Sequence, residues 1–195
     1  MRQLLLATRN AHKTREFVEI LGDEFVVRDL ADEFEMPIVQ ETGATFAENA
    51  ILKAVATSGR FPELVVGDDS GLEVDALSGA PGIYSARYAG NTASDQENVA
   101  KLLAELEGHP KVTPYPARFR CALGVAREGR VLGTFEGVVE GTIVDRARGP
   151  GGFGYDPVFQ PSGFTQTFAE LSRIEKNRIS HRARAIRLLR SWLLT

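Results

Sequence analysis

The chain has 195 residues, 43% hydrophobic and 25% charged, a composition typical of a globular protein and sufficient for one domain or two lobes that share a sheet. Its net charge of −3 argues against a general polyanion-binding protein, so we expect no nucleic acid partner. The single Cys121 excludes an intrachain disulfide and predicts a small buried hydrophobe rather than a nucleophile. Neither an apolar leader segment nor a run of about 18 apolar residues is present, which predicts a cytoplasmic protein without membrane contact.

The first third of the chain predicts strands that alternate with helices. Short apolar runs indicate buried strands, and apolar residues at helical spacing indicate amphipathic helices. Thr45 and Glu48 form a capping-box pattern before the second helix, which Gly59 ends. In chain order, we expect strands at residues 3–7, 25–30 and 63–69, a turn and helix at 8–21, and a helix at 46–59.

The remaining chain predicts hairpins between two further helices. Ser94 and Glu97 form a second capping-box pattern before a helix at 97–106, which Gly108 and Pro110 end. Apolar residues alternate from position 118 onwards, and a turn at 128–130 leads into the run at 131–144, which predicts two or three antiparallel strands. This mixture of strand–helix units and hairpins predicts an α/β fold with a mixed sheet.

A final helix is expected at residues 180–194, with Ser180 as its N-cap. Helical spacing predicts an apolar side that contains Ile186, Leu189 and either Trp192 or Leu193. The outward positions are expected to be Arg184, Arg187 and Arg190.

The most informative motif is GDDSG at residues 67–71. A strand that ends in Asp68 and Asp69, with Gly71 letting the backbone turn away, presents carboxylates at the sheet edge where α/β proteins bind ligands. Such oxygen ligands favour Mg²⁺ or Mn²⁺ shared with a phosphate. The structural alternative is an Asx-type turn, which would be preferred if the motif stood alone.

Two motifs in the first third of the chain offer partners for phosphate. In ATRNAHK, backbone amides at a helix N-terminus, with Thr8, Asn10 and Lys13, would hold phosphate oxygens, although the P-loop pattern is missing. In the second motif, Asn49 and Lys53 lie four residues apart and therefore share a helix face. The preceding Glu41 has no evident structural task, so a solvated carboxylate and a metal ligand both remain open.

Two motifs in the last third of the chain offer partners for a nucleoside. GPGGFGYDPVF, residues 149–159, has enough glycine for close backbone approach, and Phe153 or Tyr155 would stack on a base, a contact worth roughly 1–3 kcal/mol. The alternative is a tight hairpin with buried aromatic residues. Further on, Lys176 would neutralise phosphate, while His181 and Arg182 would donate hydrogen bonds to a base carbonyl.

Together these motifs resemble the Ham1-like inosine triphosphate pyrophosphatase family, in the family's order and over nearly the whole chain. The resemblance implies hydrolysis of non-canonical purine nucleoside triphosphates (ITP, dITP, XTP) to the monophosphate and pyrophosphate. It implies Mg²⁺ as cofactor, with Mn²⁺ as a possible substitute. It further implies an elongated, two-lobed α/β fold, one domain over residues 1–195 with the active site in a central cleft, and a homodimer.

The resemblance also implies residue roles. Asp69 matches the catalytic base and metal ligand, Glu41 matches its metal partner, and Asp68 and Lys53 join Asp69 as catalytic residues. Arg9 departs from the usual glycine, and Gln40 stands where some relatives have a second acid. The implied substrate-binding positions are Thr8, Arg9, Asn10, Ala11, His12, Lys13, Ser70, Phe153, Gly154, Tyr155, Asp156, Lys176, His181 and Arg182.

A mechanism follows from the residue types as well. The lysines would neutralise triphosphate charge, and a carboxylate beside a metal ion suffices to activate water for in-line attack. The sequence offers no covalent nucleophile paired with its own base, which favours direct attack by water. Two alternatives remain open: a Maf-type pyrophosphatase acting on pyrimidine or modified nucleotides, and a nucleotide- or RNA-binding module without catalysis.

Overall fold

The computed structural model describes residues 2–33, 35–109 and 114–195. Pro110, expected to end a helix, lies outside these ranges. The chain divides into two compact units. Unit 1 comprises Met1–Asp69, Cys121–Gly137 and His181–Thr195, and unit 2 comprises Ser70–Arg120 and Val138–Ser180. The helices among the described residues include none that is long and apolar enough to cross a membrane.

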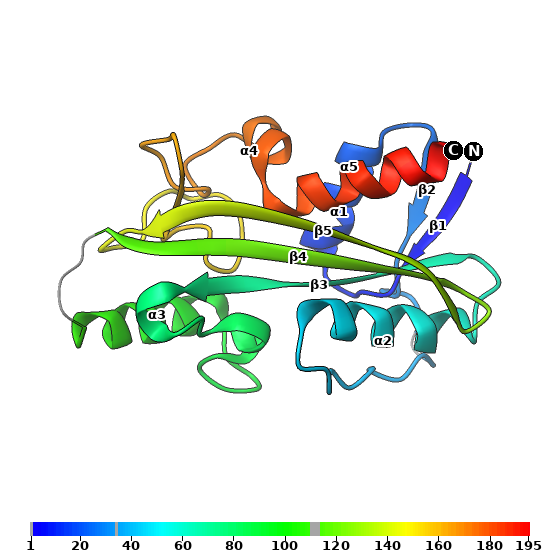
Figure 1. The fold of residues 1–195 in the computed structure, drawn as a ribbon, viewed down its shortest axis with the longest axis horizontal. Coiled ribbons are helices and arrows are strands. Elements are labelled where there is room, and N and C mark those ends of the chain that lie inside the picture. Colours follow the sequence, from blue (N-terminus) through cyan, green and yellow to red (C-terminus); the bar gives the residue numbers. More distant parts are fainter. Residues whose placement is uncertain (1, 34, 110–113) are drawn as a thin grey trace. The chain divides into compact units, whose positions relative to one another are not determined.

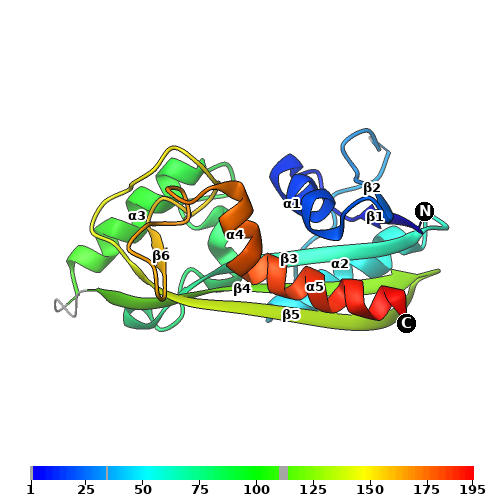
Figure 2. The same cartoon turned by 90° about the horizontal axis from the view of Figure 1, so that it is seen from above.

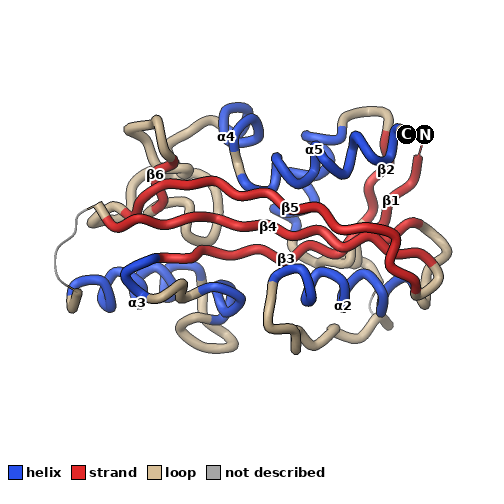
Figure 3. Tube along the Cα trace, in the orientation of Figure 1, coloured by secondary structure: helices blue, strands red, loops and turns tan. Residues whose placement is uncertain are grey.

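The strands form a six-stranded sheet in the order β2-β1-β3-β4-β5-β6 (Figure 3). Strand β1 pairs in parallel with β2 and β3, whereas β5 and β6 are antiparallel. The predicted α/β fold with a mixed sheet is therefore confirmed. The strands are β1 (Arg2–Leu6), β2 (Phe25–Arg28), β3 (Leu64–Val74), β4 (Tyr115–Arg127), β5 (Arg130–Ile143) and β6 (Phe159–Pro161).

Strand β3 corrects one expectation from the sequence. The strand does not end at Asp68 and Asp69, and the chain does not turn away at Gly71, because β3 continues to Val74. The continuation has a physical reason: Leu72 and Val74 are completely buried and belong to the core of unit 2. The acidic pair lies within the strand, which also excludes the Asx-type turn.

The hairpin between β4 and β5 has a two-residue turn at Glu128 and Gly129. Both residues have positive φ, +51° and +72°, which is the geometry of the tight turns that match the twist of antiparallel strands. The run at residues 118–144 thus forms two strands, β4 and β5, which confirms the expected hairpin. A further antiparallel strand, β6, lies outside that run and pairs with β5.

Local hydrogen bonds determine where the helices begin. Ser94 and Glu97 form the expected reciprocal capping box. Thr45 accepts a hydrogen bond from the Glu48 amide, but the Glu48 carboxylate binds the Ala44 amide instead of completing the box. The helices are α1 (Ala11–Leu21), α2 (Phe46–Ser58), α3 (Asp95–Glu107), α4 (Arg173–Ile179) and α5 (His181–Leu194), with short 3₁₀ turns at Asp75–Leu77 and Gly82–Arg87.

In unit 1, α1 and α5 cover one face of the strands and α2 covers the other (Figures 1 and 2). Helix α5 buries Ile186 and Leu189 completely, as expected. Leu193 is the third buried position, whereas Trp192 stays 37% exposed. Cys121 is buried in the same core, as the sequence predicted.

Two glycines permit α2 to lie directly on the sheet. A Cβ on Gly67 of β3 would lie 2.1 Å from the Ala50 carbonyl oxygen, and one on Gly124 of β4 would lie 2.8 Å from the Ile51 amide nitrogen. Neither backbone atom can yield as a flexible side chain would, so both strand positions require glycine. This close approach places the side chains of α2 over the middle of β3.

Candidate active site

The predicted site residues fall into two groups, one in each unit. The group in unit 1, which we call the acidic centre, consists of Glu41, Lys53, Asp68 and Asp69. Asp68 and Asp69 come from β3, Lys53 comes from α2, and Glu41 comes from the loop that precedes α2. Both aspartates are buried, with exposed fractions of 4% and 6%.

Asp69 lies against α2. Lys53 Nζ is 2.9 Å from Asp69 Oδ1 and also 2.9 Å from Glu41 Oε1, so one ammonium group joins the two carboxylates. Asn49 Nδ2 donates to Asp69 Oδ2 at 3.3 Å. The expected convergence of Asn49 and Lys53 is confirmed, because both side chains of the same helix face reach one carboxylate.

The pKa of Asp69 is raised above its usual range. Burial is the largest cause, and the nearby Glu41 carboxylate adds to it, while the Lys53 ammonium acts in the opposite direction. The pKa of Lys53 is also raised, because Asp69 and Glu41 together outweigh the effect of its burial. Asp69 therefore holds a proton more readily than an ordinary aspartate, which suits a general base.

Asp68 has a different environment although it is the neighbouring residue. Arg182 Nε donates to Asp68 Oδ2 at 2.8 Å, and Lys13 forms an ion pair with Oδ1. Cys121 Sγ lies 3.4 Å from Oδ2. Burial alone would raise the pKa of Asp68, but Arg182 and Lys13 hold it well below its usual range. Asp68 is therefore a stably ionised carboxylate.

Strand geometry explains the difference between the two aspartates. Successive side chains of a strand point to opposite faces of the sheet. Asp69 contacts residues of α2, whereas Asp68 contacts Lys13 of α1 and Arg182 of α5, which cover the other face. The sequence reveals the pair of carboxylates, and the helices on each face give them different properties.

Arg182 is committed to carboxylates in this structure. Its side chain is 1% exposed, Nε and Nη2 donate to Asp68, and Nη1 donates to Glu16 at 2.7 Å. The hydrogen bonds expected from Arg182 to a base carbonyl stay a prediction, because these donors would have to leave a carboxylate to make them. The two acids supply the compensating charge that a buried guanidinium needs. His181, its predecessor in the chain, is buried as well.

In the turn before α1, several backbone amides already donate hydrogen bonds to side chains of the same turn. Asn10 caps the helix, and its side-chain oxygen accepts hydrogen bonds from the His12 and Lys13 amides at 2.9 and 3.3 Å. Thr8 Oγ1 accepts from the Asn10 amide at 3.1 Å. The expected binding of phosphate by these amides would have to replace the side-chain acceptors. The α1 helix itself begins at Ala11.

The fit of a divalent cation rests on Glu41 and Asp69. The described ranges contain no cluster of three or more His, Cys, Asp or Glu side chains able to hold a metal ion. Mg²⁺ is commonly held by one or two carboxylates together with substrate phosphates and water. Two carboxylates that share the Lys53 ammonium meet that requirement, so these residues fit Mg²⁺ in the presence of a phosphate substrate.

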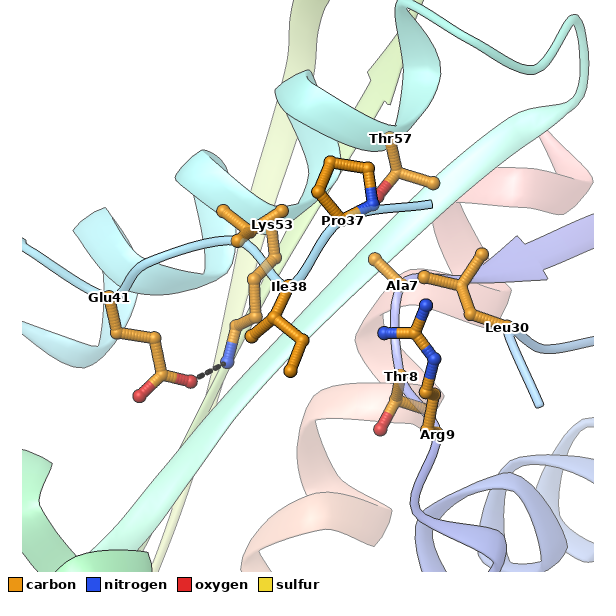
Figure 4. A pocket seen from close by; sticks show the side chains of 10 residues that line it. Ala7, Thr8, Arg9, Leu30, Pro37, Ile38, Glu41, Lys53 and Thr57 are labelled. Carbon is orange, nitrogen blue, oxygen red and sulfur yellow. Dashed lines mark hydrogen bonds and ion pairs between the residues drawn. The ribbon is translucent and has the colours of Figure 1, made fainter. Parts of the chain in front are cut away.

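A pocket of about 260 Å³ lies beside the acidic centre within unit 1. Figure 4 shows the Glu41–Lys53 pair at one end and Arg9 at the other. The pocket is lined by Ala7, Thr8, Arg9, Leu30, Pro37, Ile38, Val39, Glu41, Lys53 and Thr57.

The second group of predicted residues lies in unit 2, around the glycine-rich segment. Asp156 Oδ2 accepts hydrogen bonds from the Phe153 amide at 2.9 Å and from Lys176 Nζ at 2.6 Å. The Lys176 ammonium also lies 4.7 Å from the centroid of the Phe153 ring. Gly152 makes this fold possible, since its φ is +73° and a Cβ there would lie 2.1 Å from Asp156 Oδ2.

The same segment distinguishes between its two aromatic candidates. Tyr155 is 4% exposed, and its hydroxyl donates to the Ser85 carbonyl, so it is a core residue. Phe153 is only partly buried and remains the candidate for stacking. Gly154 donates its amide to Asp95 at 2.6 Å, a contact with α3 that the sequence did not suggest. Ser70, directly after Asp69 in β3, is half-buried.

These geometries describe an α/β protein with a carboxylate–ammonium centre in one unit and a glycine-rich aromatic segment in the other. The sequence profile of the Ham1 family matches residues 4–192, and the chain therefore belongs to that family. The resemblance inferred from the motifs is confirmed.

Individual relatives agree with this assignment. The chain is 51% identical to the dITP/XTP pyrophosphatase of Geobacillus kaustophilus, over 95% of this chain and 91% of the relative. It is 49% identical to the dITP/XTP pyrophosphatase of Bacillus licheniformis, over 99% and 98% of the two chains. Among solved structures, a HAM1 protein from Coxiella burnetii superimposes with a TM-score of 0.88 at 39% identity, covering 100% of this chain and 99% of that one.

Proposed function

We propose that this chain is a nucleoside-triphosphate pyrophosphatase that hydrolyses ITP, dITP and XTP to the monophosphate and pyrophosphate. The names of its relatives support the activity and the substrate class. The observation that carries the proposal is the environment of Asp69, a buried carboxylate with a raised pKa that shares an ammonium group with Glu41. A module that only bound phosphate would gain nothing from these carboxylates.

In this proposal Asp69 accepts the proton of the attacking water. Lys53, fixed between Glu41 and Asp69, offsets the negative charge that the triphosphate brings to the centre. Mg²⁺ held by Glu41 and Asp69 would neutralise phosphate oxygens and acidify water, and Mn²⁺ would substitute for it. Asp68 keeps Lys13 and Arg182 in place rather than taking part in proton transfer.

The glycine-rich segment of unit 2 would receive the nucleoside. Phe153 is partly exposed. Its backbone amide donates a hydrogen bond to the Asp156 carboxylate, and the Lys176 ammonium lies against its ring. An aromatic face of this kind stacks on a purine. Lys176 is buried beside Asp156 and would act on phosphate only if that ion pair opened.

The cytoplasmic location and the homodimer stay predictions. Light scattering would measure the oligomeric state.

A substrate panel tests the function. We expect Mg²⁺-dependent release of pyrophosphate from ITP, dITP and XTP, with much slower release from ATP, UTP, dTTP and methylated nucleotides. Preference for the pyrimidine or methylated nucleotides would instead indicate a Maf-type pyrophosphatase. Binding of ITP without turnover would indicate a nucleotide-binding module.

A further inference from the structure

Arg9 is the residue at which this chain departs from the glycine usual in the resembled motif, and it makes contacts that a glycine cannot make. Its Nη2 donates to the Met36 carbonyl at 2.5 Å and to the Glu33 carbonyl at 3.1 Å. Both acceptors belong to the loop between β2 and α2, and Arg9 belongs to the turn between β1 and α1. One guanidinium group therefore fastens two loops together.

Backbone hydrogen bonds link the described residues of the fastened loop to one another and to Thr8. The Leu30 amide donates to the Thr8 carbonyl at 2.9 Å, the Glu33 amide to the Leu30 carbonyl at 3.2 Å, and the Met36 amide to the Glu33 carbonyl at 3.1 Å. Arg9 binds the two carbonyls at the end of this series. The Met36 side chain is buried, and its carbonyl accepts the hydrogen bond from Arg9, so both parts of the residue are held in place.

The segment that follows has little support of its own. Among the described residues, positions 37–40 make no hydrogen bond, and Ile38 is 85% exposed. Val39 packs partly against the core of unit 1. The next residue with an ion pair is Glu41, which contacts Lys53 at 2.9 Å. Residues 37–40 are therefore held from the upstream end by the Arg9 contacts and from the downstream end by Glu41.

We propose that Arg9 is a positioning residue for Glu41. By fixing the carbonyls of Glu33 and Met36, it sets where residues 37–40 begin, and this short segment leads to the Glu41 carboxylate that contacts Lys53. The Arg9 side chain forms one wall of the pocket, and residues 37–39 form another (Figure 4). The proposal rests on the proposed metal-binding function of Glu41, while the contact between the loops does not.

The test compares Arg9→Met with Arg15→Met. Arg15 is a matched control because it is an exposed arginine of neighbouring α1 whose side chain makes no ion pair or hydrogen bond among the described residues. Methionine keeps the apolar stem and removes the donors. Three readouts are needed: deuterium exchange at the Glu33 and Met36 amides, calorimetric Mn²⁺ binding to the protein saturated with a non-hydrolysable ITP analogue, and kcat and KM for ITP across a Mg²⁺ titration.

We expect Arg9→Met to speed exchange at both amides by about tenfold, to weaken Mn²⁺ binding by about three- to tenfold, and to raise the Mg²⁺ concentration needed for half-maximal turnover. Arg15→Met should match the wild type in all three readouts. If Arg9→Met speeds exchange but leaves the Mn²⁺ affinity unchanged, Arg9 does not position Glu41. If exchange is unchanged, the Arg9 hydrogen bonds do not hold the two loops together. Failure of the wild type to bind Mn²⁺ would also overturn the proposal. Failure to hydrolyse ITP, with Mn²⁺ binding intact, would count against the proposed function alone.

Discussion

Asp68 and Asp69 are adjacent and chemically identical, yet their surroundings shift their pKa values in opposite directions. Asp68 is held ionised by Arg182 and Lys13, while burial and Glu41 raise the pKa of Asp69. Two acids whose environments separate their proton affinities are expected to have separate roles. We assign proton transfer to Asp69 and charge compensation to Asp68.

Replacing Asp69 with asparagine tests the first role. The amide is a poor base and a weak metal ligand, so we expect kcat for ITP to fall by more than tenfold, a barrier increase above roughly 1.4 kcal/mol. The circular dichroism spectrum should remain that of the wild type. Retention of more than a tenth of the wild-type kcat would count against Asp69 as the base.

The pH dependence of catalysis follows from the raised pKa of Asp69. The base must be deprotonated to act, so kcat/KM should fall as pH drops through a pKa higher than that of an ordinary aspartate. The measurement is a pH profile of kcat/KM at limiting Mg²⁺, because a cation bound to Asp69 would itself lower this pKa, and it is confined to the range in which the protein stays folded. A profile that stays flat down to the usual aspartate range would refute the shift.

The free energy of unfolding should depend on pH through Asp68, whose pKa is shifted in the opposite direction to that of Asp69. Its pKa is lowered in the folded state, so the ionised form stabilises the fold above the unfolded-state pKa, and this contribution is lost as pH falls through the folded-state pKa. Asp68→Asn leaves the buried Arg182 and the half-buried Lys13 short of one negative charge, which we expect to cost about 3 kcal/mol or more at neutral pH. Urea unfolding should show the cost shrinking in acid. A cost that is independent of pH would contradict this assignment.

At the scale of elements, the acidic centre depends on how closely α2 approaches β3 and β4. Gly67 and Gly124 allow Ala50 and Ile51 to lie against the strands. A helix that stood further from the sheet would carry Lys53 away from Asp69. Backbone packing therefore sets side-chain geometry in the site.

Gly67→Ala tests this dependence. The added Cβ would overlap the Ala50 carbonyl, so we expect a loss of about 2–3 kcal/mol in unfolding free energy, together with reduced turnover. Gly59→Ala is the control, because Gly59 ends the same helix with φ −73° and its nearest neighbour to a new Cβ is 3.8 Å away. The control should change stability by less than about 1 kcal/mol. Equal effects of the two variants would show that the close approach does not matter.

Sequence patterns predicted most elements because periodicity and capping are local properties. The capping box at Ser94 and the apolar side of α5 were visible without a structure. The same kind of signal, Ser172 followed by Glu175, marks the start of α4. The end of β3 was misjudged, because the acidic pair looked like a terminus while Leu72 and Val74 continued the strand.

The partners of the site residues were less accessible to prediction. The Arg182 contacts with Asp68 and Glu16 join residues more than a hundred positions apart, and no local pattern specifies them. The spacing of Asn49 and Lys53 did predict a shared face, because a helix imposes it. Sequence thus identified which residues gather at the acidic centre, while only the fold showed which of them compensate one another.

At the scale of the molecule, each unit has its own core and its own set of candidate site residues. The core of unit 1 surrounds the strands that carry the acidic centre, and the aromatic core of unit 2 supports the glycine-rich segment. In unit 2, the Phe119 and Phe159 ring centroids lie 4.7 Å apart. In the proposed function, unit 1 would carry the hydrolytic chemistry and unit 2 would contact the nucleoside.

The most direct test of the proposed function is hydrolysis of ITP in ¹⁸O-labelled water with Mg²⁺, followed by mass spectrometry of all products. We predict inosine monophosphate and pyrophosphate in equal amounts, with one ¹⁸O atom incorporated into only one of the two, and formation of these products more than tenfold slower with the Asp69→Asn variant. Release of inorganic phosphate and inosine diphosphate as first products would contradict the account.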